Sequence, residues 1–129
     1  MKKILFFVLI SVSFQTSAQC VRRNSTESEI RSECGYQNYK INFTDSGIRY
    51  LSFTNDEGTI NHYFNEDGYA YVVIFFPANQ GKLNTYVEKY NNQYVIVSDS
   101  QWKMYNNNGI MKIELIFAED GGYYFIYSK

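Results

Sequence analysis

The chain has 129 residues, of which 19% are aromatic and 19% charged, and a formal net charge of −1, so its length fits one ordinary domain with a substantial core. Beyond the first residues its only adjacent basic pair is Arg22 and Arg23. This pattern argues against nucleic acid or an anionic membrane surface as the principal partner, because both require a concentrated cationic face.

The first eighteen residues have the pattern of a secretory signal peptide. Lys2 and Lys3 form a basic start, residues 4–14 are mainly apolar, and residues 16–18 form a small-residue cleavage site. The apolar segment is too short for a bilayer span, and no later apolar run reaches about 18 residues. We therefore expect a secreted or periplasmic protein without a membrane span, with one mature domain over residues 19–129. Its ten basic and thirteen acidic residues give a net charge of −3.

The chain has two cysteines, Cys20 and Cys34. An oxidising compartment favours a disulfide between them. The bridge closes a loop of about 15 residues and is expected to contribute roughly 3 kcal/mol to stability. Cys20 could instead carry the lipid of a lipoprotein, but Gln19 stands where a lipidation signal requires a small residue, and lipidation would leave Cys34 without its partner.

The mature chain begins with a predicted short helix over residues 25–33. Thr26 and Glu29 have the spacing of a capping box, and Gly35 is a suitable C-terminal stop.

Three glycines, Gly47, Gly58 and Gly68, then recur at intervals of eleven and ten residues, and each closes an acidic or Asn-rich turn. Such turns between aromatic-rich segments predict a β-meander joined by tight hairpins. The predicted strands are residues 48–53, 59–64 and 69–76. The last is apolar at every position, which predicts a strand that is central in the sheet or covered on both faces. Ten residues make only one strand and its turn, so a solenoid repeat is rejected.

The period changes to that of a helix after Pro77. Four apolar residues at i, i+3, i+4 and i+7 predict an amphipathic helix over residues 80–91, with Asn79 as its N-cap. Further strands are expected at 94–98, resuming at 102–105, then at 110–118 and 123–127. The expected fold is α+β: a mainly antiparallel sheet of six to seven strands, a β-meander, with one amphipathic helix packed on a face. An all-β sandwich or barrel is the alternative.

The acidic turns do not predict catalysis or metal binding. Adjacent carboxylates such as Glu66 and Asp67 project apart into water, whereas a glycosidase holds two carboxyl groups across one bond. None of the turns has the spacing of a calcium loop. One histidine and two bridged cysteines cannot supply a usual zinc site. We therefore expect no catalytic residue, no metal and no cofactor.

The surplus of aromatic residues is the positive indication of function, because tyrosine and tryptophan suit both sugar stacking and protein interfaces. The candidate ligand-binding residues are Trp102, Tyr105, Tyr36 and Tyr39. We expect a non-catalytic binding or protein-interaction module of the cell envelope or exterior, with a protein or glycan partner. The alternative is a small secreted hydrolase that uses His62, the only histidine, with a carboxylate.

Overall fold

The computed structural model describes residues 20–21, 23–106 and 109–129. The predicted signal peptide, residues 1–18, lies outside these ranges. The elements in chain order are α2 (Glu27–Cys34), β1 (Tyr39–Phe43), β2 (Arg49–Asn55), β3 (Gly58–Phe64), β4 (Ala70–Pro77), α3 (Gln80–Gln93), β5 (Val95–Ser98), β6 (Gln101–Asn106), β7 (Gly109–Phe117) and β8 (Tyr123–Ser128).

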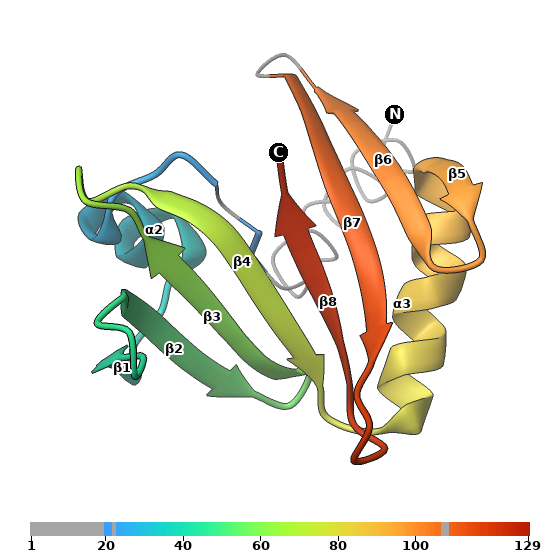
Figure 1. Ribbon diagram of the computed structural model, residues 1–129, viewed down its shortest axis with the longest axis horizontal. Helices are drawn as coiled ribbons and strands as arrows, with labels where there is room; N and C mark the ends of the chain where they lie inside the picture. The colour runs from blue at the N-terminus through green and yellow to red at the C-terminus, as the bar shows by residue number, and fades with distance from the viewer. Residues whose placement is uncertain (1–19, 22, 107–108) are drawn as a thin grey trace, which may run out of the picture.

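These eight strands form one open antiparallel sheet in the order β1-β2-β3-β4-β8-β7-β6-β5 (Figure 1). The prediction of a mainly antiparallel sheet is confirmed. The predicted number of six to seven strands was wrong, because the described residues form eight. The packing of a single helix on the sheet was also wrong, because both predicted helices, near residues 25–33 and 80–91, pack on it. The alternative of an all-β sandwich or barrel is also wrong, since one open sheet carries both helices.

The two extra strands have simple local causes. β1 alternates apolar Tyr39 and Ile41 with polar Lys40 and Asn42, and it pairs with β2 along its full length. The segment from residue 94 to 105 is divided by a two-residue turn, Asp99-Ser100, which contains no glycine. The sequence predicted an interruption between residues 98 and 102, but without a glycine it did not identify a hairpin turn there.

The helices begin at the side chains that sequence reasoning selected. The Thr26 hydroxyl accepts from the Glu29 N–H, the Glu29 carboxylate accepts from the Thr26 N–H, and Gly35 closes α2 with φ of 67°. The Asn79 side chain accepts from the Lys82 N–H at the start of α3. α3 extends two residues beyond its predicted end.

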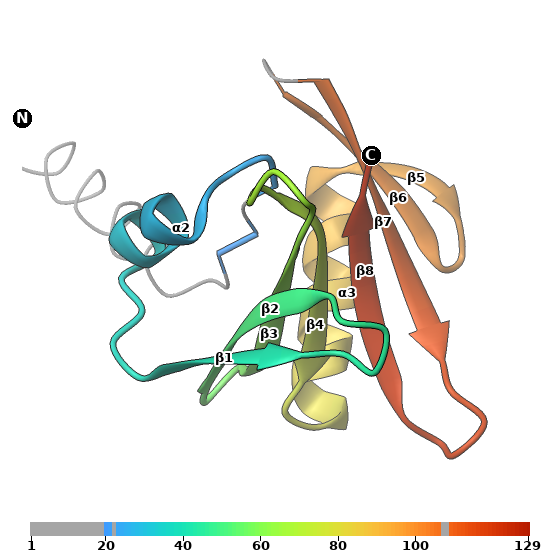
Figure 2. The ribbon, with the colours of Figure 1, turned by 60° about the vertical axis from the view of Figure 1, so that its left-hand side comes forward.

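Both helices pack on the same face of the sheet, which we call the inner face. The Tyr36 ring, just after α2, stacks on Phe53 with centroids 4.1 Å apart, and the Tyr86 ring of α3 meets Phe75 at 4.9 Å. Phe53 and Phe75 lie on one face, because both pair with Ile60. In Figure 2, β1 runs across the direction of β8, as expected for a strongly twisted sheet.

The core lies between the helices and the inner face. Its fully buried large side chains come from α2 and from most of the strands, and they include Ile30, Leu51, Phe75, Ile113 and Phe125. Alternate positions on each strand supply this layer, so the other face of the sheet carries a separate set of side chains. We call that second surface the outer face.

The chain is organised as two topologically equivalent units. The N-terminal unit contains α2 and β1–β4, and the C-terminal unit contains α3 and β5–β8; in each, a helix precedes four consecutive strands. The last strands of the units, β4 and β8, pair antiparallel at the centre of the sheet. An approximate two-fold axis therefore passes between Val73 and Tyr127, which pair with each other.

The register supports this equivalence. Val73 pairs with His62 on β3, and Tyr127 pairs with Ile113 on β7, so corresponding strands occupy corresponding places. The sequence Asn55-Asp56-Glu57-Gly58 is matched 51 positions later by the similar sequence Asn106-Asn107-Asn108-Gly109. A repeat thus exists at the length of a whole unit, rather than at the ten-residue length that sequence reasoning rejected.

Candidate functional site

Two of the four sequence-predicted ligand-binding residues are part of the core. Trp102 is 0% exposed, and its indole Nε1 donates to the Asn91 side chain of α3 at 2.8 Å. Tyr36 is buried against Phe53. Their rings therefore hold the helices to the sheet and present no surface to a ligand in this conformation.

The other two lie nearer the surface but far apart. Tyr39 is half-buried on β1, with the Arg31 guanidinium 4.6 Å from its ring centroid. Tyr105 is 58% exposed and pairs with Ile110 near the end of the β6–β7 hairpin. Five strands separate β1 from β6 in the sheet. The four predicted residues consequently do not form one site.

His62 is packed inside the protein. It is 0% exposed, and its Nε2 shares a 2.9 Å hydrogen bond with the Tyr36 hydroxyl. Burial raises the pKa of Tyr36, so this phenol stays protonated at neutral pH. Because a substrate cannot reach the imidazole in this arrangement, the geometry lends no support to a hydrolase that uses His62.

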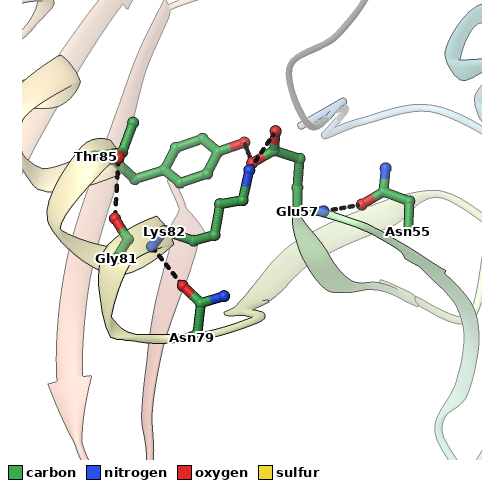
Figure 3. A network of polar contacts seen from close by, with 7 residues as sticks. Asn55, Glu57, Asn79, Gly81, Lys82 and Thr85 are labelled. Atoms are coloured by element: carbon green, nitrogen blue, oxygen red, sulfur yellow. Dashed lines mark hydrogen bonds and ion pairs between the residues drawn. The ribbon is translucent and has the colours of Figure 1, made fainter.

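One acidic turn behaves differently from the prediction. Glu57 does not project into water but reaches α3, where its carboxylate lies 3.4 Å from the Lys82 ammonium and accepts from the Tyr86 hydroxyl at 3.3 Å. The Asn55 side chain accepts from the Glu57 N–H at 2.9 Å and orders the turn (Figure 3). This network attaches the β2–β3 hairpin to the start of α3. Within the described part of the chain, no group of three potential metal ligands is found.

The outer face of the sheet is the remaining candidate. Its central row runs across seven strands in continuous register: Lys40, Ser52, Asn61, Ile74, Ile126, Glu114 and Gln101. One neighbouring row contains Asn42, Tyr50, Tyr63 and Val72, and continues beyond β4 as Ser128, Lys112, Lys103 and Val95.

The other neighbouring row of the outer face contains Thr54, Thr59 and Phe76, and continues as Tyr124 and Ile116. The rings of Phe76 and Tyr124 lie 5.5 Å apart, and Phe76 is 37% exposed. The centre of the outer face is therefore aliphatic and aromatic.

No layer of the described residues covers this apolar centre. The prediction that residues 69–76 are central in the sheet is confirmed, but coverage on both faces is wrong. Only the inner face of β4 is packed against helices, and Tyr71 and Phe76 are exposed.

On the outer face, β6 and β7 carry charged side chains, whereas β2 and β3 carry none. The C-terminal unit carries Lys103, Lys112 and Glu114, and Lys103 pairs directly with Lys112 across the β6–β7 ladder. The Lys112 ammonium lies 3.7 Å from the Glu114 carboxylate. Like charges opposite each other on two strands are unfavourable, so this pair is placed at some cost to the sheet.

On the outer face of the N-terminal unit, the described residues of β2 and β3 carry no charged side chain, and the one charge of this unit's outer face, Lys40, lies on β1. The rings of Tyr50 and Tyr63 lie 4.9 Å apart, and the Asn61 side chain donates to the Tyr63 hydroxyl at 3.3 Å. The pKa of Tyr63 is raised, mainly by burial. A second oxygen, Asn61 Oδ1, is buried and has no hydrogen-bond partner among the described residues. Alternation within residues 59–64 and 110–118 was the sequence signal for this surface.

The chain matches no family model, and no curated protein or solved structure is significantly similar to it. Within the described ranges, neither helix is long and apolar enough to cross a bilayer. The disulfide between Cys20 and Cys34 is present, and it is consistent with an oxidising compartment. Functional inference therefore rests on the geometry of the chain itself.

Proposed function

We propose that this protein is an exported, non-catalytic interaction module that binds another protein surface through the outer face of its sheet. The observation that carries the proposal is the apolar centre of that face, formed around Ile74, Ile126 and Phe76. Contiguous apolar surface without a covering layer is typical of an interaction site. Polar residues surround this centre, as in the anatomy of protein interfaces.

Export is supported by two independent features. Residues 1–18 have the composition of a secretory leader, and the Cys20–Cys34 bridge suits an oxidising compartment. The proposed place of action is consequently the periplasm or the cell exterior.

A protein partner fits the outer face better than a glycan. Sugars stack on aromatic rings, whereas in the centre of this face the aliphatic side chains outnumber the ring pair of Phe76 and Tyr124. These aliphatic residues are Val72, Ile74, Ile126 and Ile116. Tyrosine, serine and asparagine border it on the N-terminal unit, and such residues provide adaptable contacts in protein recognition.

The experiment is affinity capture from the native envelope with the mature, oxidised protein. The Ile126→Lys variant places a charge at the centre of the outer face. Asn92→Lys places the same charge at an exposed position at the end of α3 and is the matched control. We expect capture of a protein by the wild type and by the control, and loss of capture by Ile126→Lys.

Capture that Ile126→Lys leaves unchanged would show that the outer face is not the binding surface. A hydrolytic activity of the purified mature protein that His62→Ala abolishes would replace this proposal with the hydrolase alternative. Near-ultraviolet circular dichroism of each variant verifies that it is folded.

A further inference from the structure

We infer that the partner of the outer face is a second copy of this chain, and that two copies pack face to face with the N-terminal unit of one over the C-terminal unit of the other. This inference rests on the proposed function, since it names the occupant of the same surface. It is carried by the size of the face, by its register and by its distribution of charge.

The size of the face matches a stable dimer. Eight strands at a spacing of about 4.8 Å span about 38 Å, and the five or six residues that each strand commonly contributes span about 18 Å. The product is about 700 Å² per copy, close to the ~800 Å² per partner of a standard specific interface. Two sheets packed in this way lie about 10 Å apart with their strands within about 30° of each other.

The charges select one orientation. A two-fold axis that is parallel to the strands and lies between the two sheets places β6 of one copy over β2 of the other, and β7 over β3. The lysines of β6 and β7 then lie over β2 and β3, whose outer side chains are uncharged and include two tyrosines. An axis that is perpendicular to the strands and passes through the row of Lys103 and Lys112 would instead stack the two C-terminal units and bring these lysines toward their own copies, which like-charge repulsion opposes.

The register provides specific pairs in the favoured orientation. Lys103 and Tyr50 lie in the same row of the sheet, on β6 and β2, as do Lys112 and Tyr63 on β7 and β3. The axis therefore places each lysine over a tyrosine ring of the second copy, where an ammonium is attracted to the ring face. This contact offsets the unfavourable pairing of Lys103 with Lys112 within one copy.

The central row is complementary in the same orientation. Ile126 on β8 lies over Ile74 on β4 of the second copy, which buries the apolar centre on itself. Glu114 on β7 lies over Asn61 on β3, so a carboxylate meets a side-chain amide. Both copies use the same outer face in this contact. The assembly is therefore complete with two copies, and no outer face remains exposed to bind a third.

The first test is the mass of the mature, oxidised protein by light scattering and sedimentation velocity from about 1 to 100 μM. We expect a dimer, a more than 100-fold weaker association for Ile126→Lys, and no change for Asn92→Lys. Phe76→Lys, at a more exposed position of the same face, provides a second variant should Ile126→Lys fail to fold. A monomer throughout this range, or a dimer that both face variants leave intact, overturns the inference.

The second test addresses the orientation through a double-mutant cycle with Lys112→Met and Tyr63→Leu. Three strand spacings separate β7 from β3, about 14 Å, so these residues are too far apart to couple within one chain. We expect each variant to weaken the dimer about tenfold and the double variant to weaken it by much less than the product. If the double variant weakens the dimer by the full product of the two single effects, the packing of one unit over the other is overturned.

The two tests separate this inference from the proposed function. A monomeric protein whose capture of a different protein is lost in Ile126→Lys overturns the second copy as occupant and supports the outer face as an interaction surface. A protein that neither dimerises nor captures a partner through this face overturns both.

Discussion

The two units of the molecule share one topology but stabilise their inner faces by different means. In the N-terminal unit, α2 has eight residues, and Ile30 is its one buried side chain. In the C-terminal unit, α3 has fourteen residues and buries Leu83, Tyr86 and Tyr90. A short helix buries less apolar surface and gains less from packing.

The N-terminal unit, whose helix is shorter, has a disulfide and a buried hydrogen bond that the C-terminal unit lacks at the equivalent positions. The Cys20–Cys34 bridge fastens α2, and the hydrogen bond between Tyr36 and His62 joins the following segment to β3. At the position equivalent to His62, the C-terminal unit has Ile113 on β7. A covalent link and a polar pair thus accompany the shorter helix, whereas the longer helix is held by ring packing together with the side-chain contacts of Asn91 and Lys82. The same arrangement of four strands and a helix is thus stabilised by different contacts in the two units.

The largest expected effect comes from removal of the Trp102 ring, which lies at the centre of the C-terminal unit. Trp102→Ala should lower the free energy of unfolding by about 4 kcal/mol, because it leaves a cavity under α3 and removes the hydrogen bond to Asn91. Leu51→Ala, at the equivalent position of the N-terminal unit, should cost about 3 kcal/mol. Urea unfolding measures both. A loss below about 1 kcal/mol for Trp102→Ala would contradict the assigned role of the ring.

The second effect concerns the disulfide. Replacing both Cys20 and Cys34 by alanine should lower stability by about 3 kcal/mol, since the bridge closes a loop between residues 14 positions apart. Native-state hydrogen exchange should show local opening of α2, with protection retained in β7 and β8. Reduction of the wild type should reproduce the result. If hydrogen exchange became faster in α3 by as much as in α2, the bridge would not act chiefly on the N-terminal unit.

The smallest expected effect is the loss of stability at alkaline pH, counted per pH unit and per tyrosine. Burial raises the pKa of Tyr36 in the N-terminal unit and of Tyr90 in the C-terminal unit. The folded state therefore retains these protons at a pH where the unfolded chain loses them. Stability is complete below about pH 10 and should fall above it by roughly 1 kcal/mol per pH unit for each tyrosine.

Phenylalanine variants assign the alkaline response to the two units. Tyr36→Phe and Tyr90→Phe should each make the decline above pH 10 less steep, and unfolding by urea between pH 8 and 11.5 measures it. A decline that neither variant alters would exclude both phenols as its source.

Much of the N-terminal sheet could be predicted because its turns carry glycine. Gly58 illustrates the reason: its φ is 144°, and a Cβ at this position would collide with the Phe76 carbonyl oxygen. The Asp99-Ser100 turn has no such marker, so β5 and β6 were read as one interrupted segment. The unit-length repeat escaped detection because its signal is mainly topological, and only short turn sequences such as residues 55–58 and 106–109 resemble each other.

The candidate site was predicted less well than the fold. Trp102 and Tyr36 were predicted to bind a ligand because they are large aromatic residues. The size that makes a ring a good ligand contact also makes it a good core residue. The outer face depends on register between strands distant in sequence, such as Ile74 with Ile126. Local periodicity assigns a residue to a face, but it does not tell which face the helices cover.

The strand β8 follows all the other described strands in the sequence, yet it lies in the middle of the sheet rather than at its border. A nascent chain therefore completes β4 long before its neighbour exists, and the two units stay unjoined until residues 123–128 are free to fold. Until then the edge of β4 is unpaired, and an unpaired strand edge favours aggregation. Deletion of residues 123–128 would therefore remove the strand that joins the two units.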